Sequence, residues 1–204
     1  MMMIRKMACA GALLFSLAAA PIGAATVLDT GQPTGGGPEM GISTGNSFAL
    51  QFTIDATTTI TGIEGWMRSA SPDDLVIGLY GNGVGGTVPG TELQSASFTS
   101  GSGNVPGWYG ANVAWTLVAG TYWVSFEDHD DTGFALLPTG APHPAPTALG
   151  DGGSDWLVFP RSIGVRITAA DPAVPEPATW ATMILGFGLV GAAMRRRTAK
   201  GVLG

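Results

Sequence analysis

The C-terminal tail is the feature that most limits what this chain can form. Residues 175–177 read Pro-Glu-Pro, and each proline keeps the backbone out of a helix at this point. Residues 178–194 then contain no charged side chain, and a helix of this length extends about 25 Å, near the lower limit for crossing a bilayer. A basic cluster follows over residues 195–200. The tail predicts a transmembrane helix over residues 178–194, with the basic end in the cytoplasm and the preceding chain outside.

The order of these parts resembles the PEP-CTERM sorting signal in its PEPxxWA form. The matching residues are Pro175, Glu176, Pro177, Trp180 and Ala181, followed by Arg195, Arg196 and Arg197. The resemblance implies that residues 174–200 are a signal recognised by an exosortase, which cuts it near the Pro-Glu-Pro. Exosortases are membrane-embedded proteases or transpeptidases of Gram-negative bacteria. The same tail is attached to some ice-binding proteins, so it specifies an address and not an activity. An ordinary anchor helix behind a Pro-rich linker is the alternative.

The N-terminus has the three parts of a secretory signal peptide over residues 1–25. Arg5 and Lys6 supply the positive start, residues 7–20 are apolar, and small residues precede a cleavage point between Ala25 and Thr26. A retained N-terminal transmembrane helix is the alternative. Cys9 is the only cysteine in the chain, so we expect the mature protein to contain no disulfide and to depend on its core for stability.

Charge is divided unevenly along the chain. Of the nine Lys and Arg residues, two lie in the first 25 residues and four in the tail, which leaves Arg68, Arg161 and Arg166 between them. All fifteen acidic residues lie between Asp29 and Glu176, which gives this stretch a formal charge of −12. Such a surface repels nucleic acid and anionic lipid, so we expect neither as a partner. It is compatible with divalent cations or with neutral polysaccharide.

The stretch between the two ends predicts an all-β domain over residues 26–170. Glycine, serine and threonine are frequent, and apolar residues alternate with polar ones over 48–54, 75–80 and 162–168. We expect an antiparallel β-sandwich of jelly-roll type, a glycine-marked bulge within 59–68, and a tight hairpin between 111–118 and 121–126. We expect an irregular lead-in before residue 47, and residues 171–177 form the Pro-rich linker.

The densest polar cluster lies just after one of the predicted strands. It contains Glu127, Asp128, Asp130 and Asp131. Ca²⁺ takes six to eight oxygen ligands, so the cluster is a candidate calcium site that other loops would have to complete. A solvated acidic loop is the alternative. A glycosidase acid pair is a third interpretation, but it needs two carboxyls at a defined separation across a cleft.

Aromatic residues suggest a second kind of site. Trp108 and Tyr109 stand between Gly107 and Gly110 in a loop-like stretch, so we expect an exposed pair that could stack against sugar rings. Core packing is the alternative, since large aromatic side chains commonly become buried. The two histidines, His129 and His143, do not have the spacing of a zinc site. The sequence indicates no Gly-x-Ser-x-Gly elbow, in which a strand turns into a helix, that would favour a hydrolase.

These features together predict an exported protein without enzymatic activity or cofactor. Its partners would be the export machinery, an exosortase and, before processing, the inner membrane. The resemblance implies a destination at the cell surface or outside the cell, in the exopolysaccharide of a biofilm matrix, and we expect a structural role there. A carbohydrate-binding module that uses exposed aromatics is the main alternative, and a secreted hydrolase is a weaker one.

Overall fold

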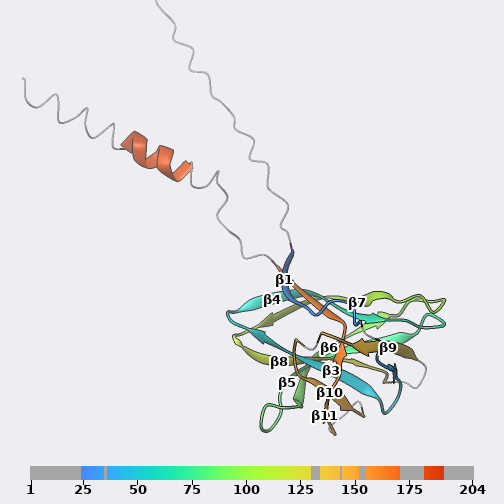
Figure 1. The fold of residues 1–204 in the computed structure, drawn as a ribbon. Helices are drawn as coiled ribbons and strands as arrows, with labels where there is room; N and C mark the ends of the chain where they lie inside the picture. Colours follow the sequence, from blue (N-terminus) through green and yellow to red (C-terminus); the bar gives the residue numbers. More distant parts are fainter. Residues whose placement is uncertain are drawn as a thin grey trace, which may run out of the picture. The chain divides into compact units, whose positions relative to one another are not determined.

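Alternating sequence patterns become strands between residues 24 and 170 (Figure 1). The computed structural model describes residues 24–34, 36–129, 134–142, 144–151, 155–170 and 182–190. The chain divides into two units, Gly23–Asp171 and the two terminal segments together. The strands of the first unit are β1 (Ala24–Asp29), β2 (Glu39–Ile42), β3 (Ser47–Ile54), β4 (Thr58–Met67), β5 (Asp74–Asn82), β6 (Pro89–Thr99), β7 (Gly107–Leu117), β8 (Gly120–Glu127), β9 (Ala135–Gly140), β10 (Thr147–Gly150), β11 (Leu157–Phe159), β12 (Ser162–Ile163) and β13 (Val165–Ala170).

Two large antiparallel sheets form the layers of this unit. The four-stranded sheet has the order β1-β13-β4-β7, and the six-stranded sheet has the order β11-β10-β3-β8-β5-β6. The chain passes repeatedly from one sheet to the other, and its first and last long strands, β1 and β13, are neighbours. This strand order is the connectivity of a jelly roll. The predicted all-β class with antiparallel sheets is confirmed.

The core lies between the two large sheets. On β3, Phe48, Leu50, Phe52 and Ile54 are buried, as their alternation predicts. The four-stranded sheet contributes residues such as Ile63 to the same cluster. A small third sheet, β12-β9-β2, adds further apolar side chains to it. Face-to-face packing of two such surfaces removes their apolar area from water, which is the main stabilising contribution to a sandwich without disulfides.

The six-stranded sheet is also covered on part of its outer face. Trp123 on β8 is fully buried on the side opposite to Val124, and it belongs to a second cluster with Ala49, Tyr80, Ala148 and Trp156. The indole of Trp123 donates a 2.8 Å hydrogen bond to the side chain of Asn82. The middle strands of this sheet are therefore buried on both faces, although their sequences alternate.

The structure changes two local predictions and confirms a third. The expected hairpin around Ala119 and Gly120 is wrong, because β7 belongs to the four-stranded sheet and β8 to the six-stranded one. The connection is an arch between layers, and both strands still turn alternate apolar residues toward the core. The lead-in expected to be irregular contains β1 and β2. The predicted bulge is present, since the register of β4 against β7 shifts between Ile60 and Gly62.

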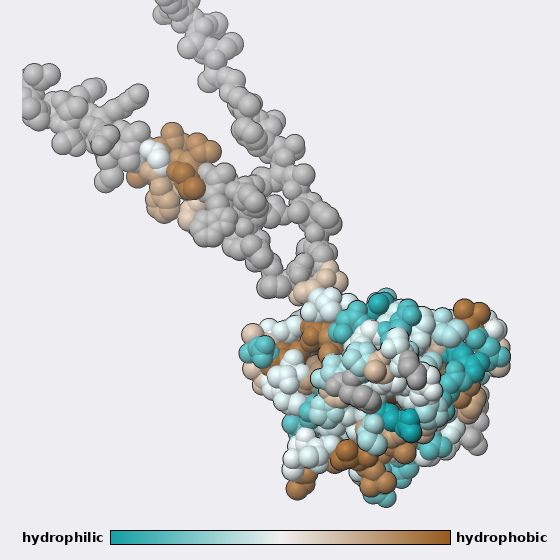
Figure 2. Space-filling view, in the orientation of Figure 1, coloured by the Kyte–Doolittle hydropathy of each residue, from teal (hydrophilic) through white to brown (hydrophobic). Residues whose placement is uncertain are grey.

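The face of the strand-containing unit that Figure 2 shows is mostly of hydrophilic to intermediate hydropathy, with separate apolar spots. Exposed apolar side chains are scattered over several strands and loops, for example Val84, Leu93 and Leu157. In the second unit the structure describes residues 182–190, which are helical. The transmembrane helix predicted over residues 178–194 extends beyond these described residues at both ends. Among the described residues, no helix is long and apolar enough to cross a membrane.

Candidate functional site

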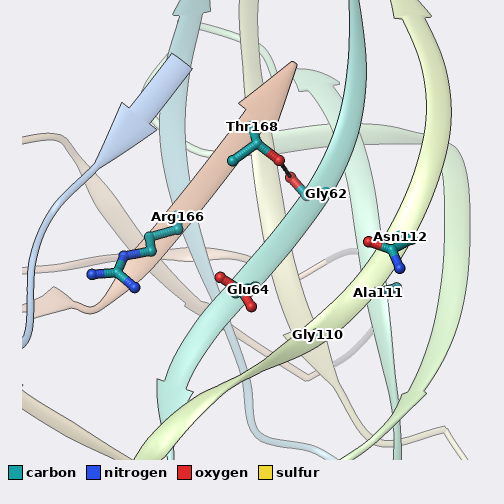
Figure 3. A pocket seen from close by; sticks show the side chains of 7 residues that line it. All are labelled: Gly62, Glu64, Gly110, Ala111, Asn112, Arg166 and Thr168. Carbon is teal, nitrogen blue, oxygen red and sulfur yellow. Dashed lines mark hydrogen bonds between the residues drawn. The ribbon is translucent and has the colours of Figure 1, made fainter. Parts of the chain in front are cut away.

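The outer face of the four-stranded sheet has a depression over β13, β4 and β7. Strand alternation points Ile63, Val165 and Ile167 into the core, so the residues between them point outward. The register places Arg166 opposite Glu64 and Thr168 opposite Gly62. The depression has a volume of about 290 Å³. Its lining residues, shown in Figure 3, are Gly62, Glu64, Gly110, Ala111, Asn112, Arg166 and Thr168.

Two glycines create the space in this surface, which we call the sheet-face depression. A Cβ atom at Gly110 would lie 1.9 Å from the carbonyl oxygen of Ile63, so a side chain cannot be added there without moving the backbone. A Cβ atom at Gly62 would lie 2.8 Å from Oγ1 of Thr168. Close approach of backbone and neighbouring groups therefore requires glycine at both positions, and the floor of the depression has no side chains there.

Arg166 is held in place at one side of the depression. Its Nε donates a 3.1 Å hydrogen bond to Oδ2 of Asp29 on β1, with which it forms an ion pair. Its guanidinium carbon lies 3.9 Å from the centroid of the Trp108 ring, a cation–π contact. Trp66 packs against Trp108 at 5.3 Å with the rings inclined by 61°. The guanidinium is thus fixed on two sides by a carboxylate and an aromatic ring.

The remaining polar groups have hydrogen-bonding capacity to spare. Thr168 donates a 3.4 Å hydrogen bond to the carbonyl oxygen of Gly62. The side chains of Glu64 and Asn112 make no hydrogen bond with any residue that the structure describes. The depression therefore offers carboxylate acceptors, an amide with both donor and acceptor, and guanidinium donors. Glu64 is the single acid among the seven described lining residues, so the depression does not supply the two carboxyls that glycoside hydrolysis uses.

The structure corrects the interpretation of Trp108 and Tyr109. Both lie within β7 and not in a loop, and both are partly buried. They point to opposite faces of the sheet, since Trp108 packs with Trp66 and Arg166, whereas Tyr109 packs against the core. They cannot stack together on one sugar ring. Trp108 borders the depression and supports Arg166.

The acidic cluster also differs from the sequence interpretation. Glu127 ends β8 with its side chain fully buried. One carboxylate oxygen accepts a 2.7 Å hydrogen bond from the Tyr80 hydroxyl and a second bond from Ser125. The other oxygen lies 2.7 Å from Nε2 of His129. Glu127 is therefore a buried hydrogen-bond acceptor rather than part of a solvated acidic loop.

Burial and the bond to Glu127 change the chemistry of Tyr80. Loss of hydration on burial is the main cause that raises the pKa of the Tyr80 phenol above its ordinary value, and the hydrogen bond to the Glu127 carboxylate raises it further. The phenol thus stays protonated and keeps donating to the carboxylate. The hydroxyl of Thr44 donates to Asp128 at 3.5 Å. Asp130 and Asp131 lie outside the described residues, and within the described ranges no three His, Cys, Asp or Glu side chains are grouped to hold a metal ion.

The predicted sorting residues cannot be placed in this geometry. Pro175, Glu176, Pro177, Trp180, Ala181, Arg195, Arg196 and Arg197 all lie outside the described residues. Ala25 and Thr26, on either side of the predicted cleavage point, lie in β1 and pair with Ala169 and Thr168 of β13.

Sequence reasoning did not find Glu64, Asn112 or Arg166 as site residues. Each stands at an outward position of an alternating strand, and that is the only signal the sequence offers. Their proximity depends on how β13, β4 and β7 pair, and no local pattern specifies that pairing.

Comparison with known protein families identifies the tail. Residues 173–197 match the family model of the PEP-CTERM protein-sorting motif. Comparison with curated proteins and with solved structures found no match. The chain therefore carries a PEP-CTERM sorting motif, as the sequence predicts. This motif indicates an exported protein with membrane-associated processing, and its partner in that processing is an exosortase.

Proposed function

We propose that this protein is a non-enzymatic structural component of the cell surface or of the exopolysaccharide matrix in a Gram-negative bacterium. The observation that carries the proposal is the match of residues 173–197 to the PEP-CTERM motif, directly after a jelly-roll unit that ends near residue 171. In this proposal a signal peptide over residues 1–25 starts export. A membrane helix over residues 178–194 then holds the precursor in the inner membrane until an exosortase cuts near Pro175.

The chemistry of the jelly roll supports a role without catalysis. The sheet-face depression has a single carboxylate, on Glu64, among its described lining residues. The buried acid Glu127 is engaged by Tyr80, Ser125 and His129. Neither arrangement presents a nucleophile beside a free base, which covalent catalysis requires. A stable sandwich with a polar surface fits a protein that persists outside the cell.

Intact mass measurement of the protein from its host tests the sorting step. We expect a species that begins near Thr26 and ends near Pro177 in the medium or outer envelope. Replacing Pro175, Glu176 and Pro177 with alanine should leave a form ending at Gly204 in the inner membrane. The matched control, alanine at Asp171 and Pro172, changes the same linker outside the matched motif and should be processed normally.

Fractionation of the biofilm tests the destination. We expect the processed protein to remain with the extracellular polysaccharide after cells are removed, and a deletion strain to form a mechanically weaker matrix. Equal processing of the alanine variant and the wild type would contradict the sorting proposal. Recovery of the processed protein only as freely soluble material, with an unchanged matrix in the deletion strain, would contradict the structural role.

A further inference from the structure

We propose that the sheet-face depression binds a sugar unit of a neutral polysaccharide through Glu64, Asn112 and Arg166. The inference deepens the proposed function and rests on it, since it names the matrix component that the jelly roll would hold. The binding step itself is a property of the protein in solution, so it can be tested separately from sorting.

Several polar groups on this small surface have unfilled hydrogen-bonding capacity. Glu64 and Asn112 have no hydrogen-bond partner among the described residues, and Arg166 uses only its Nε, toward Asp29. Register places Arg166 directly opposite Glu64, on strands about 5 Å apart. Asn112 lies on the other side of β4, opposite Gly62, which is two residues from Glu64. Sugar hydroxyls donate and accept at once, and they match a mixed set of carboxylate, amide and guanidinium groups.

The shape of the depression suits a small polar ligand. Gly62 and Gly110 leave the floor without side chains, and the resulting volume of about 290 Å³ is at the lower end of ligand pockets, which span roughly 300–1,000 Å³. Figure 3 shows Glu64 in the middle of this surface, with Arg166 to one side of it and Asn112 to the other. A depression of this size takes one unit of a chain and lets the polymer continue across the sheet.

Arg166 is preorganised for binding. Asp29 and the Trp108 ring fix the Arg166 guanidinium before any ligand binds. A fixed side chain loses little conformational freedom on binding, which leaves more of the contact energy as affinity. Trp108 therefore acts as a positioning residue for Arg166, because one face of its ring is already covered by the guanidinium.

The charge of this surface selects the class of polysaccharide. Around the depression, Glu64 and Asp29 carry two negative charges against the single positive charge of Arg166. The stretch from Asp29 to Glu176 has a formal charge of −12. Polymers bearing uronate, sulfate or phosphate groups are repelled by this surface. A neutral glycan avoids the repulsion and still satisfies the polar groups.

The test is a binding measurement with the full chain in a detergent that carries no sugar. The probes are neutral glucan, mannan and galactan oligosaccharides, the neutral fraction of the host's extracellular polysaccharide, and charged alginate and chitosan oligosaccharides. We expect a neutral probe to bind with an affinity that 0.5 M salt leaves nearly unchanged. Glu64→Gln and Asn112→Ala should each weaken that binding by about tenfold or more, the loss expected when a hydrogen-bonded contact is removed.

Matched controls are available on the exposed edge strand β6. Glu92→Gln and Gln94→Ala make the same kinds of change at exposed positions away from the depression, and they should leave binding and melting temperature unchanged. Absence of binding to every neutral probe, equal binding by the Glu64 and Asn112 variants, or binding only to charged probes that salt removes would each overturn the proposal. If no glycan binds but the tail is processed normally, only the binding proposal is overturned. If the tail is not processed but a neutral glycan binds, only the sorting proposal is overturned.

Discussion

Replacing Tyr80 with phenylalanine should destabilise the jelly roll measurably. The substitution removes one hydroxyl, which donates a 2.7 Å hydrogen bond to the fully buried carboxylate of Glu127. A hydrogen bond to a charged group contributes about 1.5–3 kcal/mol. Because Ser125 still donates to the same carboxylate oxygen, we expect a loss near the lower end, about 1.5–2 kcal/mol. For a unit of this size that corresponds to a decrease in Tm of roughly 3–8 °C.

Chemical denaturation of the full chain, followed by tryptophan fluorescence, measures this loss. Tyr122→Phe is the matched control, because its hydroxyl donates a 3.0 Å hydrogen bond to the backbone oxygen of Val118 at an exposed position. Water can replace that bond, so the control should change the free energy of unfolding by less than about 0.5 kcal/mol. Equal stability of Tyr80→Phe and the wild type at pH 7 would refute the proposed role of the Glu127 carboxylate.

The same pair of proteins gives a pH dependence with a defined sign. The pKa of Tyr80 is raised in the folded protein, so the folded state holds this proton more tightly than the unfolded state. The resulting stability is complete below the ordinary pKa of about 10 and is lost as the pH rises above it. The wild type should therefore lose stability between pH 9 and 11 faster than Tyr80→Phe, and the gap between them should narrow. A gap that stays constant over this range would show that Tyr80 does not titrate as the structure implies.

Three further substitutions test other parts of the fold. Arg68 donates hydrogen bonds to Glu39 and lowers the pKa of its carboxyl group. The stabilising contribution of this pair is therefore present above about pH 4.5, and it is lost as the pH falls through the pKa of Glu39 in the folded protein. Glu39→Gln should make the free energy of unfolding depend less on pH in the acid range. Gly110→Ala should destabilise by about 2 kcal/mol or more because its Cβ would meet backbone, whereas Gly81→Ala, with open space around it, should be tolerated in the same thermal melt. Ser47→Ala should be neutral or stabilising by up to about 1 kcal/mol in urea denaturation, since the Ser47 hydroxyl is buried without a hydrogen-bond partner among the described residues. A clear loss of stability would contradict this expectation.

Local patterns were enough for most of the strands. Phe48, Leu50, Phe52 and Ile54 alternate on β3 and are all buried, because a period of two has only one way to hide an apolar face in a sheet. The short strands β9 and β10 were not predicted. β9 is a strand because it pairs with β2 and β12, and β10 because it pairs with β3 and β11. Segments of four to six residues have too little periodicity to predict such pairing.

The residues of the sheet-face depression were not predicted from the sequence, and the two sites that were predicted have other surroundings in the structure. Trp108 was expected to touch sugar directly, and it instead supports Arg166. Glu127 was expected in a loop, and its burial results from Tyr80, Ser125 and His129 gathering around it. In both cases the deciding neighbours come from other strands, and their distances depend on register.

By itself the sequence determined what can be read one segment at a time. The order of Pro-Glu-Pro, apolar stretch and arginine cluster specified the sorting motif over residues 173–197. Such a motif can be recognised from the sequence because the position of apolar and basic residues along the chain predicts how a segment meets a membrane. Alternation similarly specified a β-rich domain between the two ends. Only the tertiary structure decided that the link between β7 and β8 is an arch and that Glu64, Asn112 and Arg166 share one depression. The reason is physical: an alternating strand presents the same faces in a hairpin or an arch, and the choice is made by packing against strands far away in the chain.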